Sequence, residues 1–402
     1  MKFIVPSQIL SKNLQLVSGI ISTGSPVPIT ECVLFELKDK QLTLTATDLE
    51  TTMVTSLEVS DADGDINIAI PAKILLDTLK ELSDVPVNFE IEENLSIEIT
   101  AEDANFRLVG APADEFPEKP TMEEKEGSVS FEVDAKILSN GINKTIFAAA
   151  QQDIRPVMSG VYCLVQPESL TFVATDAHRL VRFVDKTTQT GIDASFILPK
   201  KPLSLLKNYF SSVDDKVKIS YDGTKMVGFT YDKLQVITKL IEGKYPNYEA
   251  VIPRENHNIL KVERLLFMKK MRTILPYGNY DKHSSRSMGM QIKSDVLQLT
   301  AQDDFDHKAE ITMPCIFEGQ FNAPQKETQD GDAGFDASAE TAEDTVFKIG
   351  FDPKFLQDML GVLDTEEVIL ELKDANTAGL IYPLADGERD DQILMLLMPV
   401  MI

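Results

Sequence analysis

The run Leu-Thr-Phe-Val-Ala-Thr-Asp-Ala-His-Arg-Leu occupies residues 170–180, where an alternating segment ends in a polar cluster. This pattern predicts a β-strand followed by a turn. Related runs occur twice more, as Leu-Thr-Leu-Thr-Ala-Thr-Asp at 42–48 and as Leu-Gln-Leu-Thr-Ala-Gln-Asp at 297–303. Asp48, Asp176 and Asp303 are thus 128 and 127 positions apart. The spacing predicts three copies of one domain-sized unit.

Length and composition agree with three globular domains, which we expect at 1–125, 126–254 and 255–402. The chain has 402 residues, of which 43% are apolar and 26% charged. Its first residues form a strand pattern rather than a signal peptide, and no apolar run approaches the length of a membrane span. Cys32, Cys163 and Cys315 are far apart and lack metal-ligand spacing. We therefore expect buried thiols, no metal and a cytoplasmic location.

Each copy contains the same order of elements, with a strand and a helix first, then a hairpin, a proline and a second helix. Pro71 and Pro199 are 128 positions apart, in register with the aspartates. Helices are expected at 8–21, 72–82, 135–149, 200–211, 262–275 and 353–363. The predicted fold class is α+β, with two helices on mainly antiparallel sheets in each copy.

The third copy departs from the repeat because Pro353 lies 154 positions after Pro199. The excess falls at about 319–344, a segment rich in Gly, Asp, Glu, Ala and Thr. Such a composition buries too little apolar surface to offset its ordering entropy, so it predicts a disordered insertion. An acidic recognition arm is the alternative.

Positive charge is concentrated in the expected helices. They hold thirteen Lys and Arg against four Asp and Glu, although the whole chain has a net charge of −25. If the repeats place every helix on one side, that side is basic and suits nucleic acid. The alternative is that solvated helix faces simply favour lysine.

An enzymatic interpretation would use Asp176 and His178, which point the same way if they lie on a strand and could share a proton. Arg179 would then bind an anion. No nucleophile motif, Gly-rich phosphate loop or metal spacing accompanies them. A structural interpretation is that Asp176 caps the turn and Arg179 pairs with a carboxylate. A scaffold that does not bind DNA is a third possibility.

Several segments together resemble the bacterial DNA polymerase III beta subunit, the sliding clamp. They are the start Met1-Lys2-Phe3, the turn Thr47-Asp48-Leu49-Glu50, residues 174–180, Lys244-Tyr245-Pro246-Asn247-Tyr248 and the ending Met398-Pro399. The resemblance covers the chain outside 319–344. It implies a homodimeric head-to-tail ring around duplex DNA, with helices lining the hole and neither an active site nor a cofactor. The implied partners are the replicative polymerase alpha subunit, the clamp loader and other proteins with clamp-binding motifs.

The resemblance also implies three groups of site residues. The partner-peptide pocket would comprise Met158, Thr175, Ala177, His178, Leu180, Pro246, Val251, Leu396, Leu397, Met398, Pro399 and Met401. DNA contacts would include Lys73, Lys80, Gln152, Arg155, Lys200 and Lys201, whereas Gly24 replaces an arginine found in some clamps. The dimer interface would comprise Phe106, Leu108, Ile274 and Leu275.

The chain end supports the pocket independently of the resemblance. Residues 397–402 are almost uninterruptedly apolar. Because exposed termini are commonly polar, this segment should be buried or line a binding groove. Ala177 stands where the family usually has glycine, and Met401 stands where a basic residue can occur.

Overall fold

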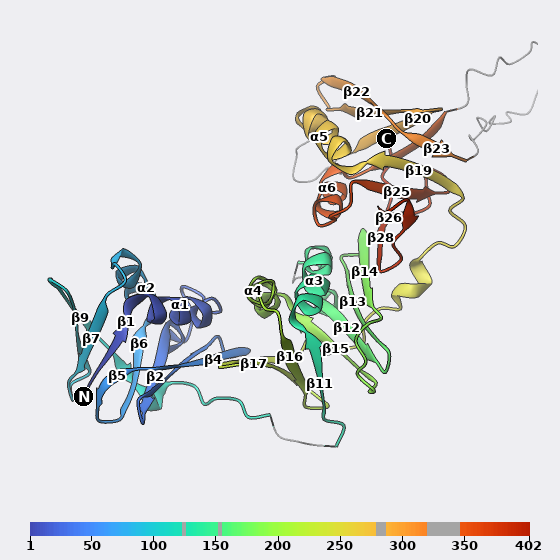
Figure 1. Cartoon of the computed structure of the whole chain (residues 1–402). Helices are drawn as coiled ribbons and strands as arrows, with labels where there is room; N and C mark the ends of the chain where they lie inside the picture. The colour runs from blue at the N-terminus through green and yellow to red at the C-terminus, as the bar shows by residue number, and fades with distance from the viewer. Residues whose placement is uncertain (123–125, 152–154, 279–286, 320–345) are drawn as a thin grey trace, which may run out of the picture. The chain divides into compact units, whose positions relative to one another are not determined.

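The computed structural model describes residues 1–122, 126–151, 155–278, 287–319 and 346–402 (Figure 1). The predicted acidic insertion lies outside the described residues, apart from Gly319. The described residues divide into two compact units. The first comprises Met1–Ile142, Gly160–Leu170 and Lys186–Lys244, and the second comprises Asn143–Ser159, Thr171–Asp185 and Tyr245–Ile402. The three-domain boundaries stay a prediction.

Helices form where apolar periodicity and prolines predict them. In the described part of the chain the α-helices are α1 (Ser7–Ser18), α2 (Ala72–Glu81), α3 (Ala135–Thr145), α4 (Lys200–Phe210), α5 (Arg264–Ile274) and α6 (Pro353–Gly361). The short 3₁₀ segments are η1 (Pro28–Glu31), η2 (Ala113–Glu115), η3 (Ile146–Ala148), η4 (Pro156–Met158), η5 (Tyr248–Val251) and η6 (Leu275–Tyr277). The helix expected at 135–149 is shorter, because its last turn tightens into η3.

The first unit contains two antiparallel sheets. One has the order β5-β1-β7-β8-β9, from β1 (Lys2–Pro6), β5 (Ser60–Asp63), β7 (Pro86–Ile91), β8 (Ser96–Ala101) and β9 (Ala104–Val109). The other has the order β10-β6-β2-β3-β4-β18-β17-β16-β11, from β2 (Cys32–Lys38), β3 (Gln41–Thr47), β4 (Thr51–Glu58), β6 (Ile66–Pro71), β10 (Ala111–Pro112), β11 (Val129–Asp134), β16 (Lys216–Tyr221), β17 (Met226–Tyr231) and β18 (Leu234–Lys239). Strands β12 (Gly160–Gln166) and β15 (Ala194–Pro199) pair with each other.

The second unit repeats this construction. One sheet runs β13-β14-β28-β26-β25-β19-β23, with β13 (Ser169–Thr175) contributing from Thr171 onward. Its other strands are β14 (Arg179–Asp185), β19 (Asn258–Glu263), β23 (Ile316–Glu318), β25 (Glu367–Leu372), β26 (Gly379–Ala385) and β28 (Ile393–Leu397), with β27 (Glu388–Arg389) on β26. The second sheet runs β22-β21-β20-β24, from β20 (Met288–Lys293), β21 (Val296–Gln302), β22 (Lys308–Pro314) and β24 (Phe347–Phe351). The predicted α+β class is therefore confirmed.

One hydrogen bond marks the internal repeat at the start of α1, α3 and α5. The backbone N–H of Ser7 donates to Val85 O at 2.9 Å, and Ala135 N–H donates to Asp215 O at 2.9 Å. Arg264 N–H donates to Glu366 O at 2.8 Å. Each bond satisfies a helix N–H that has no partner within its own helix. The same local problem is thus solved the same way in all three copies.

Apolar side chains between the helices and sheets hold each unit together. Phe3 and Phe89 on the paired strands β1 and β7 are fully buried and stack with ring centroids 4.8 Å apart. Burying one such side chain contributes about 2 to 3 kcal/mol. Cys32, Cys163 and Cys315 are free and buried, which confirms their predicted packing role.

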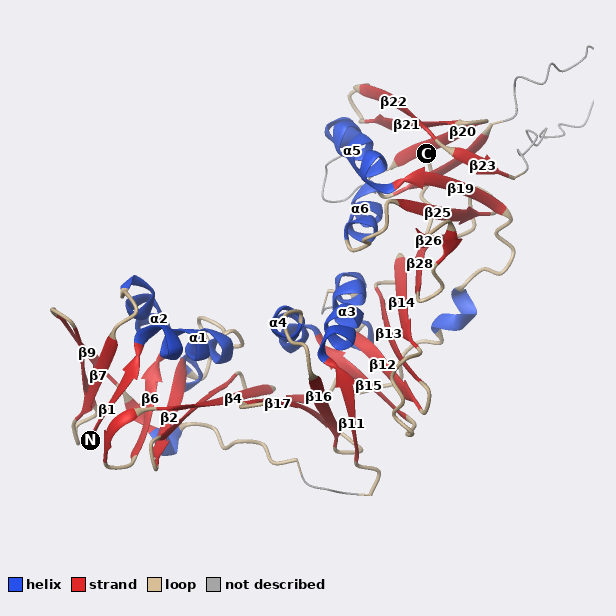
Figure 2. Cartoon of the chain, viewed as in Figure 1, coloured by secondary structure: helices blue, strands red, loops and turns tan. Residues whose placement is uncertain are grey.

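In the first unit the helices share one side of the sheets, as Figure 2 shows for α1, α2 and α4. The end of α1 packs so closely on α4 that a Cβ on Gly19 would come within 2.7 Å of Leu205 Cδ2. This contact joins elements of the first and second sequence repeats, so the repeats place their helices in one row there.

Two joints between repeats use the same kind of strand pairing. In the first unit, β4 pairs antiparallel with β18, which places Thr51 opposite Thr238. In the second unit, β14 pairs antiparallel with β28, which places Arg179 opposite Leu397. Each joint combines the strand that follows the aspartate turn of one repeat with the last strand of the next. Strands β9 and β22 lie at the ends of their sheets.

Two kinds of feature are absent from the described residues. No described helix has both the length and the apolar character needed to cross a membrane. In the same part of the chain, no group of three or more His, Cys, Asp or Glu side chains is arranged to hold a metal ion.

Candidate functional site

The turn between β13 and β14 is built by Thr175 and Asp176. Thr175 Oγ1 donates to Arg179 O at 2.7 Å and accepts the N–H of Ala177 at 3.2 Å. Asp176 Oδ1 accepts the N–H groups of His178 at 3.0 Å and Arg179 at 2.9 Å. Short polar side chains that bond to nearby backbone favour this kind of turn. The Thr-Asp pair in the sequence therefore specifies the turn.

Ala177 has a left-handed backbone, with φ of 75°. Glycine adopts this region without steric cost, whereas the Cβ of alanine is strained there. The equivalent turn of the first repeat has the same geometry, because Leu49 has φ of 76° and Asp48 Oδ1 accepts the N–H groups of Glu50 and Thr51. The third repeat closes its turn one residue later, from Asp303 N–H to His307 O.

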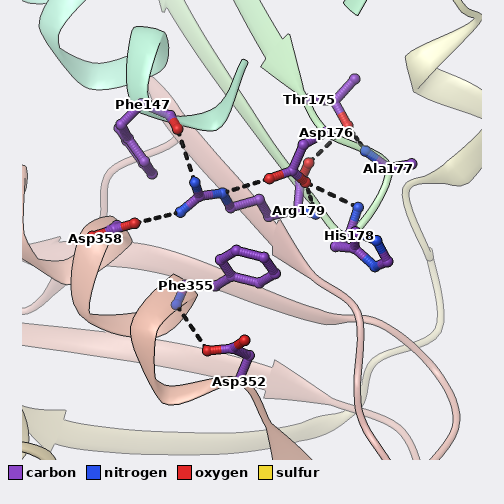
Figure 3. A network of polar contacts seen from close by, with 9 residues as sticks. All are labelled: Phe147, Thr175, Asp176, Ala177, His178, Arg179, Asp352, Phe355 and Asp358. Atoms are coloured by element: carbon purple, nitrogen blue, oxygen red, sulfur yellow. Dashed lines mark hydrogen bonds and ion pairs between the residues drawn. The ribbon is translucent and has the colours of Figure 1, made fainter. Parts of the chain in front are cut away.

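Arg179 connects this turn to α6 (Figure 3). Its Nε donates to Asp176 Oδ2 at 3.0 Å, and its Nη1 donates to Asp358 Oδ2 at 2.8 Å. Its Nη2 donates to Phe147 O at 2.9 Å. The guanidinium also lies 4.4 Å from the ring centroid of Phe355 and 5.2 Å from that of Phe147. Arg179 is only 8% exposed, so these contacts replace its lost hydration.

The predicted Asp-His pair does not exist in the form that a proton-sharing mechanism requires. Asp176 and His178 lie in the turn rather than on a strand. Asp176 accepts the backbone N–H of His178, and its second oxygen is bound by Arg179. The His178 ring instead lies against Phe355, with centroids 6.2 Å apart. The strand interpretation was wrong, and the alternative of a capping aspartate with a paired arginine is confirmed.

The chain end lies beside this turn. Leu180 is opposite Leu396 in the β14–β28 ladder, and the N–H of Met398 donates to His178 O at 2.8 Å. Leu396 and Leu397 are buried, whereas Met398 is 42% and Met401 93% exposed. The apolar terminus therefore divides into a buried strand and an exposed tail next to the turn.

The other predicted pocket residues come from two further segments of the same unit. Met158 is buried at the end of η4, and its carbonyl accepts the N–H of Ala150 at 2.8 Å. Pro246 follows Tyr245, whose hydroxyl donates to Val173 O at 3.4 Å. Val251 ends η5 and is 59% exposed.

The raised pKa of Tyr245 is consistent with a role as a hydrogen-bond donor to β13. Burial raises the pKa of the Tyr245 hydroxyl and outweighs the opposing effect of a backbone hydrogen bond from Thr175. The hydroxyl consequently stays protonated and can donate to β13 across the physiological pH range. Tyr245 thereby fixes the start of the Pro246 segment beside β13.

The predicted pocket residues thus differ in exposure. The buried residues, which support the surface from below, are Met158, Thr175, Leu180, Leu396 and Leu397. The exposed residues are Ala177, His178, Pro246, Val251, Met398 and Met401, and Pro399 is half-buried. The exposed residues are mostly apolar and come from the turn, the Tyr245 segment and the tail. Such a surface suits an extended apolar peptide rather than a polar small molecule.

Four of the predicted DNA-binding lysines belong to helices of the first unit. Lys73 and Lys80 are exposed on α2, while Lys200 and Lys201 begin α4. Lys201 Nζ lies 2.5 Å from Asp48 Oδ2 and 2.9 Å from Ser22 Oγ. Arg155 is exposed in the second unit, and Gln152 lies outside the described residues. The described cations thus come from α2, from the start of α4 and from the residue before η4.

The predicted interface residues lie on the sheet-end strand β9 and at the junction of α5 with η6. Phe106 and Leu108 are on β9, where Phe106 is half-buried and Leu108 is 7% exposed. Ile274 ends α5 and is only 2% exposed, whereas the next residue, Leu275, is half-buried. Ile274 therefore packs within its own unit, and Leu275 is the cleaner residue with which to probe an interface.

Sequence reasoning missed several residues that support the site. Asp358, Phe147 and Phe355 surround Arg179, and Lys144 Nζ contacts Val362 O and Asp364 Oδ2, the latter at 2.6 Å. Lys144 is 3% exposed. The sequence signals a partner for Arg179, yet nothing in it selects a carboxylate 179 positions away.

Replacing Arg179 with alanine should destabilise the second unit by about 3 kcal/mol, because breaking a buried ion-pair network has this cost. We expect the unfolding temperature to fall by several degrees in calorimetry. Arg254→Ala, at an exposed position of the same unit, is the matched control. Equal stability of the two variants would contradict the role assigned to Arg179.

Comparison with family models identifies two successive domains. The model for the N-terminal domain of the DNA polymerase III beta subunit matches residues 1–120, and the model for its central domain matches residues 132–247. The beta sliding clamp of Pseudomonas aeruginosa is 29% identical over 397 residues, covering 98% of this chain and 99% of that protein. The beta sliding clamp of Vibrio cholerae is 25% identical over 407 residues, covering both proteins completely.

Solved structures show the same fold over the whole chain. The sliding clamp of Pseudomonas aeruginosa bound to griselimycin aligns with a TM-score of 0.86 and 28% identity, covering 100% of both chains. The DNA polymerase III beta subunit of Thermotoga maritima aligns with a TM-score of 0.85 at 24% identity, covering 100% of this chain and 99% of that chain, which supports the fold alone. Two family models covering more than half of the sequence, together with full-length relatives, show that this chain belongs to the DNA polymerase III beta subunit family of sliding clamps.

Proposed function

We propose that two copies of this chain close head to tail into a ring around duplex DNA and tether proteins of DNA replication to it. The family consists of DNA sliding clamps, which are processivity factors and not enzymes. In this chain the proposed ring holds DNA by topology, and the exposed apolar surface of the second unit binds partner peptides.

The repeated strand joint is the observation that carries the proposed ring. The pairings β4 with β18 and β14 with β28 each use the strand after an aspartate turn and the last strand of the following repeat. By the same rule, β22 of the third repeat requires the end strand of a first repeat's five-stranded sheet, which is β9. Both are sheet-edge strands in this chain. A second copy can cover both edges through a symmetric pair of joints.

The charges on the helices support the proposal that the ring encloses duplex DNA, which is a polyanion. The net positive charge on the helix side of the first unit comes mainly from α4, which has Lys200, Lys201 and Lys207 and no acidic residue, in a chain that is acidic overall. On α2, two lysines are balanced by Asp77 and Glu81. Scattered lysines give weak, salt-dependent and sequence-independent contacts. The proposed DNA contacts are Lys73, Lys80, Gln152, Arg155, Lys200 and Lys201. Such contacts allow sliding, because none of them reads a base.

The partners that fit the apolar surface carry a short extended segment with one or two large apolar anchors. We infer that the replicative polymerase alpha subunit, the clamp loader and other proteins with clamp-binding motifs use it in turn. Their common site would make binding exclusive at each surface. We place this function in the cytoplasm, where replication takes place.

A charge on β9 should weaken the dimer. Two chains of 44.7 kDa give about 89 kDa, which we expect by light scattering at micromolar concentration. Phe106→Glu places an unpaired carboxylate in the proposed joint, and Leu275→Ala removes apolar contact from its other side, so both should shift the mass toward monomer. Ile316→Glu, at a 55% exposed position on another sheet-end strand, should leave the dimer intact. A wild-type monomer would contradict the ring.

Truncating an exposed residue of the apolar surface should weaken partner binding without affecting dimerisation. We expect Met398→Ala to lower the affinity for a polymerase C-terminal peptide about tenfold in calorimetry, because a central apolar contact typically contributes roughly 1 to 3 kcal/mol. Leu180→Ala should also weaken binding, although Leu180 is buried and acts partly through β14.

Lys200→Ala, on α4, is the control for this measurement and should leave peptide affinity unchanged. Wild-type affinity in both Met398→Ala and Leu180→Ala would place the partner site elsewhere on the molecule.

A further inference from the structure

The last five residues are held at two points after β28 ends. The N–H of Met398 donates to His178 O at 2.8 Å, which ties the tail to the β13–β14 turn. The N–H of Val400 donates to Gly350 O at 2.9 Å, which ties it to β24. Pro399 lies between these bonds. The tail is therefore a bridge from the turn to the four-stranded sheet.

The sheet receives the tail at a pair of glycines. Gly289 on β20 and Gly350 on β24 are directly opposite each other in the antiparallel ladder. Both are buried, and neither has the left-handed backbone that would require glycine. Glycine weakens a strand interior, so its presence at two paired positions marks a close approach by another part of the chain.

That approaching part is the tail. A Cβ on Gly350 would lie 2.5 Å from Val400 O and inside contact distance of Ile402 Cγ2. Its next neighbour would be Ile402 Cβ at 3.5 Å. A Cβ on Gly289 would lie 3.6 Å from Ile402 Cδ1, but it would also collide with Thr300 Oγ1. The three atoms nearest to a Gly350 Cβ thus all belong to the tail.

We propose that Gly350 is a positioning residue for the partner-peptide surface. Because glycine has no side chain, Ile402 can pack directly on β24, and this contact holds Met398 and Pro399 in place at the edge of the surface. This inference rests on the proposed peptide-binding function. Gly350 acts through the tail, and the peptide contacts remain with Met398, Pro399 and Met401. Seating the tail before the peptide arrives removes part of the ordering cost from binding.

The contrast in exposure along the tail fits this role. Met398 is 42% and Met401 93% exposed, so both are available to a partner. Ile402 is 64% exposed, yet its side chain reaches both glycines. The seat therefore holds the tail on one side and leaves its methionines accessible.

Gly350→Ala tests the seat directly in the full chain. We expect it to weaken a polymerase C-terminal peptide about three- to tenfold, the size of effect that ordering a few rotatable groups produces. The dimer should persist, and the unfolding temperature should change by no more than about 3 °C, because alanine fits an extended strand. Gly361→Ala, where a Cβ would make only an ordinary 3.8 Å contact with Met268 Cε, should bind like the wild type.

Two further variants separate positioning from general damage to the sheet. Ile402→Ala removes the seated side chain without touching β24 and should weaken the peptide by a similar factor. In a chain truncated after Pro399 the seat is empty, so adding Gly350→Ala should cause no further loss. The inference would be overturned if Gly350→Ala lowered peptide affinity as much in the truncated chain as in the full-length chain. Wild-type affinity in the full-length Gly350→Ala variant would also overturn it. If the wild-type chain itself fails to bind the peptide, the proposed function fails instead.

Discussion

Main-chain pairing between successive repeats is the constraint on which the rest of this structure depends. The strand after an aspartate turn has unpaired N–H and C=O groups, and in two joints the last strand of the next repeat satisfies them. Joints made in this way leave two strands at sheet ends: β22, which follows the aspartate turn of the third repeat, and β9 in the first repeat. A lone copy exposes both edges to other chains, which natural sheets generally avoid. A closed arrangement with a second copy removes both, so the ring that we propose follows from the same pairing that joins the repeats.

The aspartate turn has acquired a second role in the middle repeat. In the first repeat, Asp48 caps its turn and meets the ammonium of Lys201. In the second repeat, Asp176 caps the same turn and also holds the buried guanidinium of Arg179, which reaches α6 through Asp358. A buried charge is costly unless its donors are satisfied, and here three are bonded within a layer of aromatic rings. The result is a rigid edge beside the exposed tail, which is a suitable support for a peptide surface.

Local patterns and the internal repeat made much of this structure predictable. The Thr-Asp pairs of the first two copies fixed the turn positions, and Pro71, Pro199 and Pro353 marked the starts of the second helices. Long-range pairing was not predictable in this way. The partner of Arg179 lies on α6, and the depth of Ile274 depends on how α5 packs. The enzymatic alternative was wrong to place Asp176 and His178 on a strand, because alternation does not reveal where a strand ends and the left-handed Ala177 turns the chain. Gly289 and Gly350 carried no signal alone, since their meaning comes from facing each other under the tail.

Retention on circular DNA is the most direct test of topological holding. The chain is loaded onto a nicked circle with a clamp loader and ATP, separated from free protein at high salt, and then the circle is cut once. A closed ring should stay on the intact circle, because salt screens its scattered lysine contacts without opening it, and it should leave the linear product by sliding off the ends. Loss from the intact circle at high salt, or equal retention after linearisation, would contradict a ring that holds DNA by enclosure.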